Sequence, residues 1–330
     1  MSRTASVYGL YLTDLLAECC DWNRSTCEFM DIHLNPMNCL ALECLLGCRA
    51  EEVLGCTISG TSPDLLPLWI SHVSPSWNVS ERKTVMNAGF CPAVCGYCLV
   101  EDLHSGRSQH VRLSWYCSVT TMCPSHRTPL RQCCHDFMPV SDSCGHRREY
   151  RTRLRCGSCT HMVDDFSLSG RIDEIACASL ANFESALCRA ISGKHISMFT
   201  GVAVPGDSLL LFVQDMVWAL MRPVEGTRYR IVHALQRDPF RMPFGFNTPV
   251  DVSHWLSFGS LPLRRCLLAV VAGILQPENP LWPADFGTLG VGTRRFWRLL
   301  RERMSPSTVT LLFDRAEQWH PTLFDRSGFY

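Results

Sequence analysis

The sequence has no hydrophobic run long enough to cross a membrane, and we recognise no secretory signal in it. Its longest uncharged apolar stretch near the C-terminus, CLLAVVAGIL at 266–275, covers about half of the roughly 20 residues that a membrane-spanning helix needs. At the N-terminus, Asp14 stands inside the stretch that would be apolar in a signal peptide. We therefore expect a cytoplasmic protein without a membrane partner, whose cysteines are reduced thiols or metal ligands rather than disulfides.

The chain also has no excess of charge of either sign, because 31 Lys and Arg residues balance 31 Asp and Glu residues. A strongly basic chain would indicate a nucleic-acid partner, so any DNA contact here must come from a local patch. The sequence lacks the patterns G-x-x-x-x-G-K-[ST], G-x-S-x-G and H-E-x-x-H. It also lacks the H-x-E of zinc deaminases. These absences favour a protein that is not an enzyme.

Cysteine, by contrast, is abundant and unevenly distributed. Of 20 cysteines, seven lie before residue 60, ten lie between Cys91 and Cys159, and three follow. In a chain of 330 residues that is 46% hydrophobic and 19% charged, this distribution predicts three globular regions. They are a helical, helix-turn-helix-like segment at 1–85, a zinc-ribbon region at 86–165 and a helical C-terminal domain at 166–330. The fold class that we expect is mainly α, with a small β component in tandem zinc ribbons.

Helical spacing of apolar residues characterises the first and third regions. In NCLALECLLGCRAEEVL, at 38–54, Gly47 separates two predicted helices, which fits a helix-turn-helix or a plain helical hairpin without a DNA role. The predicted apolar face of the first helix comprises Leu40, Leu42, Leu45 and Leu46. The cysteines that we interpret as small core residues are Cys19, Cys20, Cys39, Cys44 and Cys48. The predicted helices of the third region include 171–191, 208–221 and 264–275.

Two pairs of metal-binding side chains stand at the same spacing in the middle region. Cys95 and Cys98 form a C-x2-C pair, and Cys123 and His126 form a C-x2-H pair. Three thiolates and one imidazole would fill a closed tetrahedral zinc site of the structural type. About one C-x2-C pair is expected by chance at this cysteine frequency, so the alternative is four ordinary core residues. Between the pairs, the alternation in VRLSW at 111–115 predicts a β-strand.

A second zinc site is predicted further along the same region. Cys156 and Cys159 form another C-x2-C pair, and we expect Cys134 and Cys144 to complete it, with His135 as the substitute. Because each set fills all four positions of its metal, neither leaves a position open for a catalytic water. Structural zinc of this kind would contribute on the order of 10 kcal/mol to the folding of a segment with little apolar content.

Between the two predicted sites runs HRREYRTRLR, at 146–155, in which five arginines meet one acid, Glu149. These arginines are Arg147, Arg148, Arg151, Arg153 and Arg155. On a loop held by zinc, they predict a surface for phosphates or for an acidic partner. The equally good alternative is a solvated strand whose alternating arginines face water.

The middle region resembles the TniQ/TnsD family of transposition proteins over roughly residues 91–160. That family carries a C-x2-C-L-x-E-D knuckle, an R-x-x-W strand, and a Val-Thr pair shortly before C-P-x-H-x-x-x-L and a further cysteine. The matching residues here are Cys95, Cys98, Leu99, Glu101, Asp102, Arg112, Trp115, Val119, Thr120, Cys123, Pro124, His126, Leu130 and Cys134. The combination fixes ligands, strand and acidic pair together, which makes it more specific than any one spacing.

The resemblance reaches the second predicted zinc with one departure. Cys156 and Cys159 stand where the family's second pair closes. The other pair of the family's second zinc would need a cysteine three residues after Cys134, where this chain has Phe137. The residues that could replace it are Cys144, Cys133 and His135; otherwise the second zinc is lost.

What the resemblance implies is target selection rather than catalysis. Proteins of this family mark the insertion site, by binding target DNA or by docking on an RNA-guided DNA-binding complex, and recruit the transposon's AAA+ ATPase. Some members act as homodimers. The alternatives are a RING-like or other zinc-binding interaction module, a zinc-dependent enzyme with an open metal position, and a cysteine-rich helical protein without metal.

Overall fold

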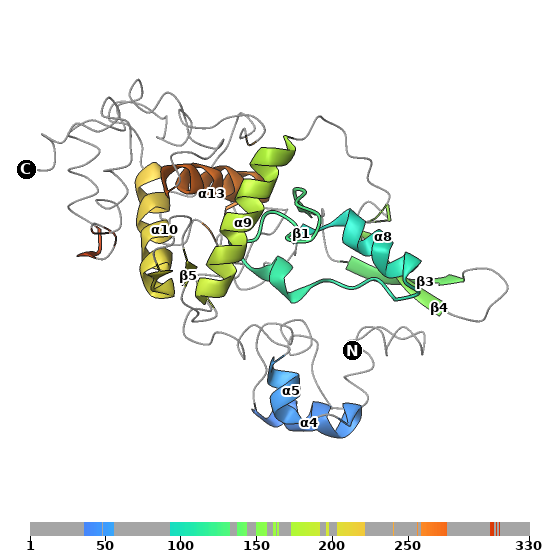
Figure 1. Cartoon of the computed structure of the whole chain (residues 1–330). Coiled ribbons are helices and arrows are strands. Elements are labelled where there is room, and N and C mark those ends of the chain that lie inside the picture. The colour runs from blue at the N-terminus through green and yellow to red at the C-terminus, as the bar shows by residue number, and fades with distance from the viewer. Residues whose placement is uncertain are drawn as a thin grey trace, which may run out of the picture. The chain divides into compact units, whose positions relative to one another are not determined.

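The computed structural model of the chain describes residues 36–47, 49–55, 93–132, 137–143, 150–156, 161–162, 164, 173–191, 196–197, 203–221, 240, 256, 259–275, 304–306, 308 and 310. Over these ranges most of the regular structure is helical and the strands are few and short (Figure 1), which confirms a mainly α fold class with a small β component. The chain divides into two compact units, Met1–Cys117 with Leu130–Ser169, and Ser118–Pro129 with Gly170–Tyr330. None of the helices within the described ranges is long and apolar enough to span a membrane.

Two short helices stand in the N-terminal part of the first unit, as the sequence predicts. Helix α4 spans Pro36–Leu46 and helix α5 spans Ala50–Gly55. Between them Gly47 has a φ of 66°, and its N–H donates to the carbonyl four residues earlier at 2.9 Å. Helix α4 therefore ends where the backbone conformation favours a residue without a side chain. Glu52 caps α5 by accepting from the backbone N–H of Arg49 at 3.0 Å.

The predicted apolar face of α4 is partly wrong. Leu42 is fully buried, but Leu40 is 50% exposed, because residues two positions apart point to different sides of a helix. Of the cysteines interpreted as core residues, Cys39 is buried and Cys44 is exposed. The others, Cys19, Cys20 and Cys48, lie outside the described residues, as do the side chains of Leu45 and Leu46.

Another helix of the first unit follows directly on a short strand. Strand β1 (Ala93–Val94) pairs antiparallel with β2 (Arg131–Gln132), and helix α8 spans Gly96–His104. The strand predicted at 111–115 is wrong, because its last three residues belong to the 3-10 helix η3, Leu113–Tyr116. Its apolar alternation reflects a compact turn that buries Trp115 to 1% exposure rather than a pleated strand.

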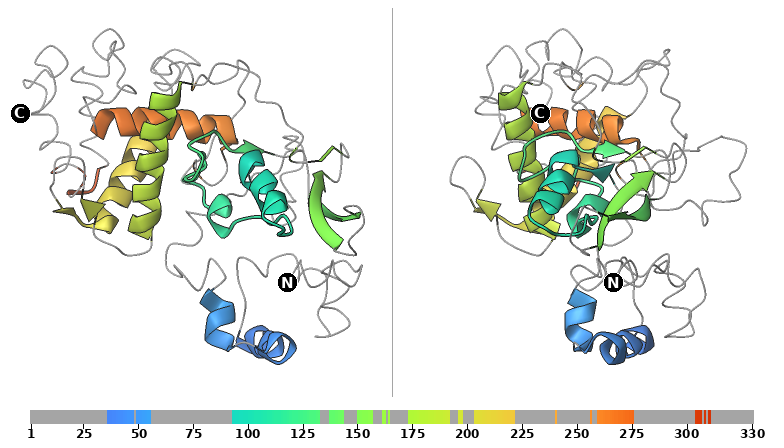
Figure 2. Two further views of the ribbon diagram at one scale, coloured as in Figure 1. Left: turned by 45° about the vertical axis from the view of Figure 1, so that its right-hand side comes forward. Right: turned by 90° about the vertical axis from the view of Figure 1, so that its right-hand side faces the viewer.

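A two-stranded antiparallel ribbon, seen in Figures 1 and 2, is the longest β structure in the described residues. It pairs β3 (Phe137–Ser143) with β4 (Tyr150–Cys156). The buried side chain of Gln109 ties this ribbon to α8. Its amide nitrogen donates to the carbonyl of Leu99 at 3.1 Å, and its oxygen accepts from the backbone N–H of Leu154 at 2.7 Å. A buried amide requires such partners, so Gln109 fixes the ribbon against the helix.

Three helices that contact one another pairwise form the described core of the second unit. They are α9 (Glu174–Ile191), α10 (Gly206–Leu220) and α13 (Leu261–Leu275), and Figure 1 shows α13 running across the other two. Helix α9 begins where the Asp173 side chain accepts from two backbone N–H groups of the first turn, at 3.0 and 3.1 Å. The helices predicted at 171–191, 208–221 and 264–275 are confirmed. A pair of two-residue strands, β5 (Ile196–Ser197) and β6 (Ala203–Val204), was not predicted.

Candidate metal centre

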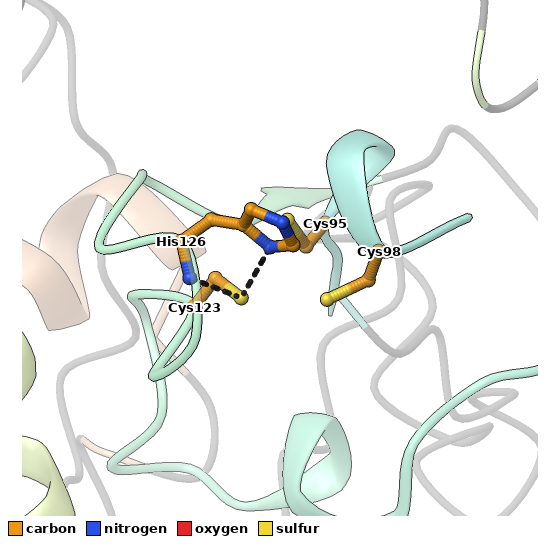
Figure 3. A group of neighbouring side chains, drawn as sticks. All are labelled: Cys95, Cys98, Cys123 and His126. Atoms are coloured by element: carbon orange, nitrogen blue, oxygen red, sulfur yellow. Dashed lines mark hydrogen bonds between the residues drawn. The ribbon is translucent and has the colours of Figure 1, made fainter. Parts of the chain in front are cut away.

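Four side chains converge in the middle of the chain. The ligand atoms of Cys95, Cys98, Cys123 and His126 all lie within 4.8 Å of one another. Figure 3 shows the three thiols and the imidazole turned toward a common point. The cysteines are buried, with at most 5% of each exposed, and the histidine is half-buried. The four residues that the sequence singles out for the first metal site are thus brought together.

The first ligand pair is delivered by a strand and the helix that follows it. Cys95 directly follows β1 and has extended backbone angles, with φ −104° and ψ 115°, at the N-cap of α8. Its carbonyl accepts the backbone N–H of Leu99 at 3.2 Å, which closes the first helical turn. Cys98 lies within that turn, and residues three positions apart on a helix share a face. The spacing of the pair is therefore set by one helical turn.

The second ligand pair is held by a tight turn of its own. The N–H of Cys123 donates to the carbonyl of Thr128 at 2.8 Å, and the N–H of Arg127 donates to the carbonyl of Cys123 at the same distance. The N–H of His126 donates to the sulfur of Cys123 at 3.4 Å, a contact marked in Figure 3. Arg127 has a φ of 52°, the sole positive φ at a non-glycine residue within the described ranges. The turn thus points the thiol and the imidazole to one side.

The donor set and its spacing fit zinc. With zinc–sulfur and zinc–nitrogen bonds of about 2.3 and 2.05 Å, a tetrahedral ion separates two sulfurs by about 3.8 Å and a sulfur and a nitrogen by about 3.5 Å. The sulfur of Cys123 lies 3.5 Å from Nδ1 of His126. No two ligand atoms of the cluster are more than 4.8 Å apart, so a contraction of at most about 1 Å brings every pair to the tetrahedral value. Three thiolates and one imidazole would fill the coordination sphere, as in structural zinc sites.

A buried carboxylate lies behind the first ligand pair. Asp102, on α8, has no exposed surface, and both of its oxygens accept from the guanidinium of Arg112, at 2.8 and 3.1 Å. The same guanidinium donates to the carbonyl of Cys98 at 3.2 Å and lies 4.8 Å from the centroid of the Trp115 ring. His110 also places Nδ1 3.1 Å from the carboxylate. Charged and aromatic groups therefore hold the helical turn that carries Cys98.

A second buried carboxylate lies behind the other pair, and the sequence alone did not reveal it. Oε2 of Glu184, on α9, accepts from the backbone N–H groups of Thr121 and Met122, both at 2.8 Å. Oε1 accepts from the hydroxyl of Thr121. Burial raises the pKa of Glu184 to about 8, against the opposing effect of these hydrogen bonds. In the sequence, Glu184 could have been singled out as an acidic residue on the apolar face of a predicted helix. Its neighbours on that face, Leu180, Phe183 and Leu187, are all fully buried.

Most of the predicted second zinc set lies outside the described residues. The residues of this set that the structure does not describe are Cys134, Cys144, Cys159 and the substitute His135. Cys156 ends β4, with Phe137 as its register partner on β3. The second zinc therefore stays a prediction.

The predicted basic surface is described only in part. Arg147 and Arg148 lie outside the described residues, and for Arg151 the structure gives the backbone position alone, opposite Asp142. Arg153 is in an ion pair with Asp164 at 2.9 Å, so its charge is neutralised within the protein. Arg155 is half-buried. A role for these arginines in phosphate binding stays a prediction.

The Cys95, Cys98, Cys123 and His126 cluster is the one group of metal-ligand side chains found within the ranges that the structure describes. Comparisons of the chain with protein-family models, curated proteins and solved structures gave no match.

Proposed function

We propose that the chain is a non-catalytic adaptor of DNA transposition, which selects or marks the target site and recruits the transposon's AAA+ ATPase. The observation that carries this proposal is that residues of the TniQ/TnsD-like pattern contact one another around a buried ligand cluster. They are separated in sequence by up to 31 positions, between Cys95 and His126, yet their ligand atoms lie within 4.8 Å. If the residues of the pattern serve one metal site, they must come together in the folded chain in this way.

The pattern residues that are not ligands support the proposal as well. A chance coincidence of cysteine spacings gives no reason for Asp102, Arg112 and Trp115 to meet, yet the guanidinium binds the carboxylate and also lies over the indole ring. The apolar pattern positions Leu99, Val119 and Leu130 are each at most 1% exposed. Six positions of the pattern that are not ligands, with acidic, basic, aromatic and aliphatic side chains among them, are therefore packed or paired in this chain.

Zinc bound at this cluster would stabilise the segment rather than react. The four ligands would supply folding free energy to a region whose strands β1 and β2 are two residues long and cannot hold it alone. Consecutive ligand pairs share the cluster, which favours a zinc ribbon. In a RING-like module the pairs would interleave, with alternate pairs sharing one ion. In the proposed adaptor, the zinc-braced region presents the surface that partners contact.

Binding to the ATPase tests the proposal. The full chain, purified with zinc, would be immobilised and exposed to the AAA+ ATPase encoded beside it, with and without DNA carrying the insertion site. We expect saturable binding that Cys123→Ser abolishes and that Cys117→Ser, a half-buried cysteine outside the cluster, leaves unchanged. Zinc-loaded wild-type protein that binds neither the ATPase nor DNA would overturn the adaptor function.

A RING-like or other zinc-binding interaction module would also hold zinc in closed four-ligand sites, but a RING would pair the ligands differently. A mutation series with zinc counting separates the two. In a ribbon, Cys95→Ser releases the zinc of its own cluster and leaves any zinc at Cys156 in place. In an interleaved fold, the same substitution releases both ions together.

A further inference from the structure

Helices α9 and α13 of the second unit hold the segment that leads into the second ligand pair. From α9, the carboxylate of Glu184 accepts from the backbone N–H groups of Thr121 and Met122. From α13, the guanidinium of Arg264 donates to the carbonyl of Ser118 at 2.8 Å. Arg265, next along α13, donates to the carbonyl of Thr121 at 3.3 Å. Side chains from distant parts of the sequence therefore fix the backbone immediately before Cys123.

These contacts act on the segment just before a turn that is closed by its own hydrogen bonds. Within the turn, the N–H of Cys123 donates to Thr128 and the N–H of His126 donates to the thiol sulfur. These hydrogen bonds fix how the two ligands of the turn lie relative to each other. The two N–H groups that immediately precede Cys123 donate to Glu184, so the carboxylate connects the start of the turn to α9.

We propose that Glu184 is a positioning residue of the metal centre: by accepting two successive backbone N–H groups, it holds Cys123 and His126 where they can bind the ion with Cys95 and Cys98. Hydrogen-bond partners one step removed from a metal typically change its affinity by about 10- to 100-fold when they are removed. The inference rests on the proposed metal centre, but not on its use in transposition.

The hydrogen-bond geometry predicts which substitutions the position tolerates. Oε2 accepts from the two backbone N–H groups, and Oε1 accepts from the Thr121 hydroxyl, which can itself accept a hydrogen bond. Glutamine keeps one oxygen that can accept from the two backbone N–H groups. Its NH2 group replaces the other oxygen and can donate a hydrogen bond to the Thr121 hydroxyl. Leucine fills a similar volume and accepts nothing, so it leaves two buried N–H groups without a partner.

Zinc affinity of the full chain, measured by competition with a chromophoric chelator, tests the inference. We expect Glu184→Leu to weaken zinc binding about 10- to 100-fold and Glu184→Gln to restore an affinity within about threefold of wild type. Glu174→Gln, an exposed acid on the same helix, is the matched control and should change nothing. If the leucine variant does not fold, Glu184→Asp is measured instead. The shorter aspartate side chain cannot reach both N–H groups, so we expect the same loss of zinc affinity.

Each outcome of that measurement decides the question. Wild-type affinity in the leucine variant, or in the aspartate variant that replaces it, would overturn the role of Glu184, and so would an equal loss in the glutamine variant. A purely structural role would lower the thermal stability of the metal-free and zinc-loaded proteins equally and leave zinc affinity unchanged. If the wild-type chain binds no zinc at all, the metal centre itself fails, which is a different result from a metal centre that ignores Glu184.

Discussion

Arg112 binds both carboxylate oxygens of Asp102 through its two terminal nitrogens, at 2.8 and 3.1 Å. The carboxylate has no exposed surface, whereas about a quarter of the arginine side chain is exposed. Because the same guanidinium reaches the carbonyl of Cys98, the pair joins the chain after α8 to the helical turn that carries a metal ligand. An ion pair of this kind matters most when one partner is lost, since the other charge then stays buried with less compensation. Here His110 and Arg107 would remain at 3.1 and 3.6 Å from the carboxylate.

Removing the arginine should therefore be costly. We expect Arg112→Leu to lower the free energy of unfolding by about 3 kcal/mol, the lower end of the range for a broken buried pair, because Asp102 loses its two hydrogen bonds to the guanidinium but keeps His110 beside it. Arg107→Leu is the matched control: this arginine lies 3.6 Å from the same carboxylate but is 55% exposed, so a loss below about 1 kcal/mol is expected. Urea unfolding of the zinc-loaded variants measures both values. Equal losses in the two variants would show that the bidentate pair contributes no more to stability than the exposed arginine does.

Removing the metal should unfold the region around the ligand cluster. Structural zinc contributes on the order of 10 kcal/mol, so a strong chelator should lower the thermal midpoint of the wild-type protein sharply. Cys123→Ser should have the low midpoint with or without the chelator, because it lacks one ligand. Cys117→Ser, which changes a half-buried thiol outside the cluster, should respond like wild type. A wild-type midpoint that is insensitive to the chelator would contradict a structural metal.

Ionisation of Glu184 should make stability fall as pH rises. Burial raises the pKa of its carboxyl from 4.5 to about 8, so the folded state favours the protonated form. That contribution is complete below about pH 4.5 and is lost as pH rises through about 8. Glutamine cannot ionise, so Glu184→Gln should gain stability relative to wild type between pH 5 and 8, by on the order of a few kcal/mol.

Unfolding of both proteins at saturating zinc across this pH range measures the difference. Zinc binding to thiols itself strengthens with pH, but both proteins share that effect, so the difference isolates Glu184. The neighbouring groups that act on this carboxyl, Cys188 on the same helix and Arg265 on α13, are present in both proteins. A difference that stays constant from pH 5 to 8 would contradict the raised pKa.

The arginines of the basic stretch can be separated by their contacts. If Arg147, Arg148 and Arg151 bind phosphates, changing all three to glutamine should reduce the slope of log affinity against log salt for DNA by about 2–3. Arg153→Gln should leave the slope unchanged and lower stability instead, because this arginine is paired with Asp164. Filter binding or fluorescence anisotropy over a salt series measures the slopes. An unchanged slope in the triple variant would exclude phosphate contacts by these residues.

Local patterns predicted much of this fold because their causes are local. Gly47 ends α4 through a positive φ, and the apolar stripes of α9, α10 and α13 define helices with a buried face. The convergence of Cys95 and Cys98 with Cys123 and His126 was also predictable, since two pairs at knuckle spacing supply one complete zinc ligand set.

What the sequence could not reveal depends on contacts between distant positions. The alternation around Trp115 predicted a strand, but the cation–π contact with Arg112 and the burial of Asp102 favour a 3-10 turn there. Glu184 stands out as an acid on an apolar helix face, yet its partners lie more than 60 positions earlier in the chain. Arg264 is likewise 2% exposed on α13, and its partner Ser118 is 146 positions away.

X-ray absorption spectroscopy of the protein purified with zinc tests the metal centre most directly. If Cys95, Cys98, Cys123 and His126 bind one ion, the zinc of that site has three sulfur neighbours at about 2.3 Å and one nitrogen at about 2.0 Å. A Cys123→Ser protein should then contain one zinc fewer than wild type. Protein that retains no zinc after purification in its presence, or zinc surrounded by oxygen atoms, would contradict the metal centre and remove the basis for the proposed function.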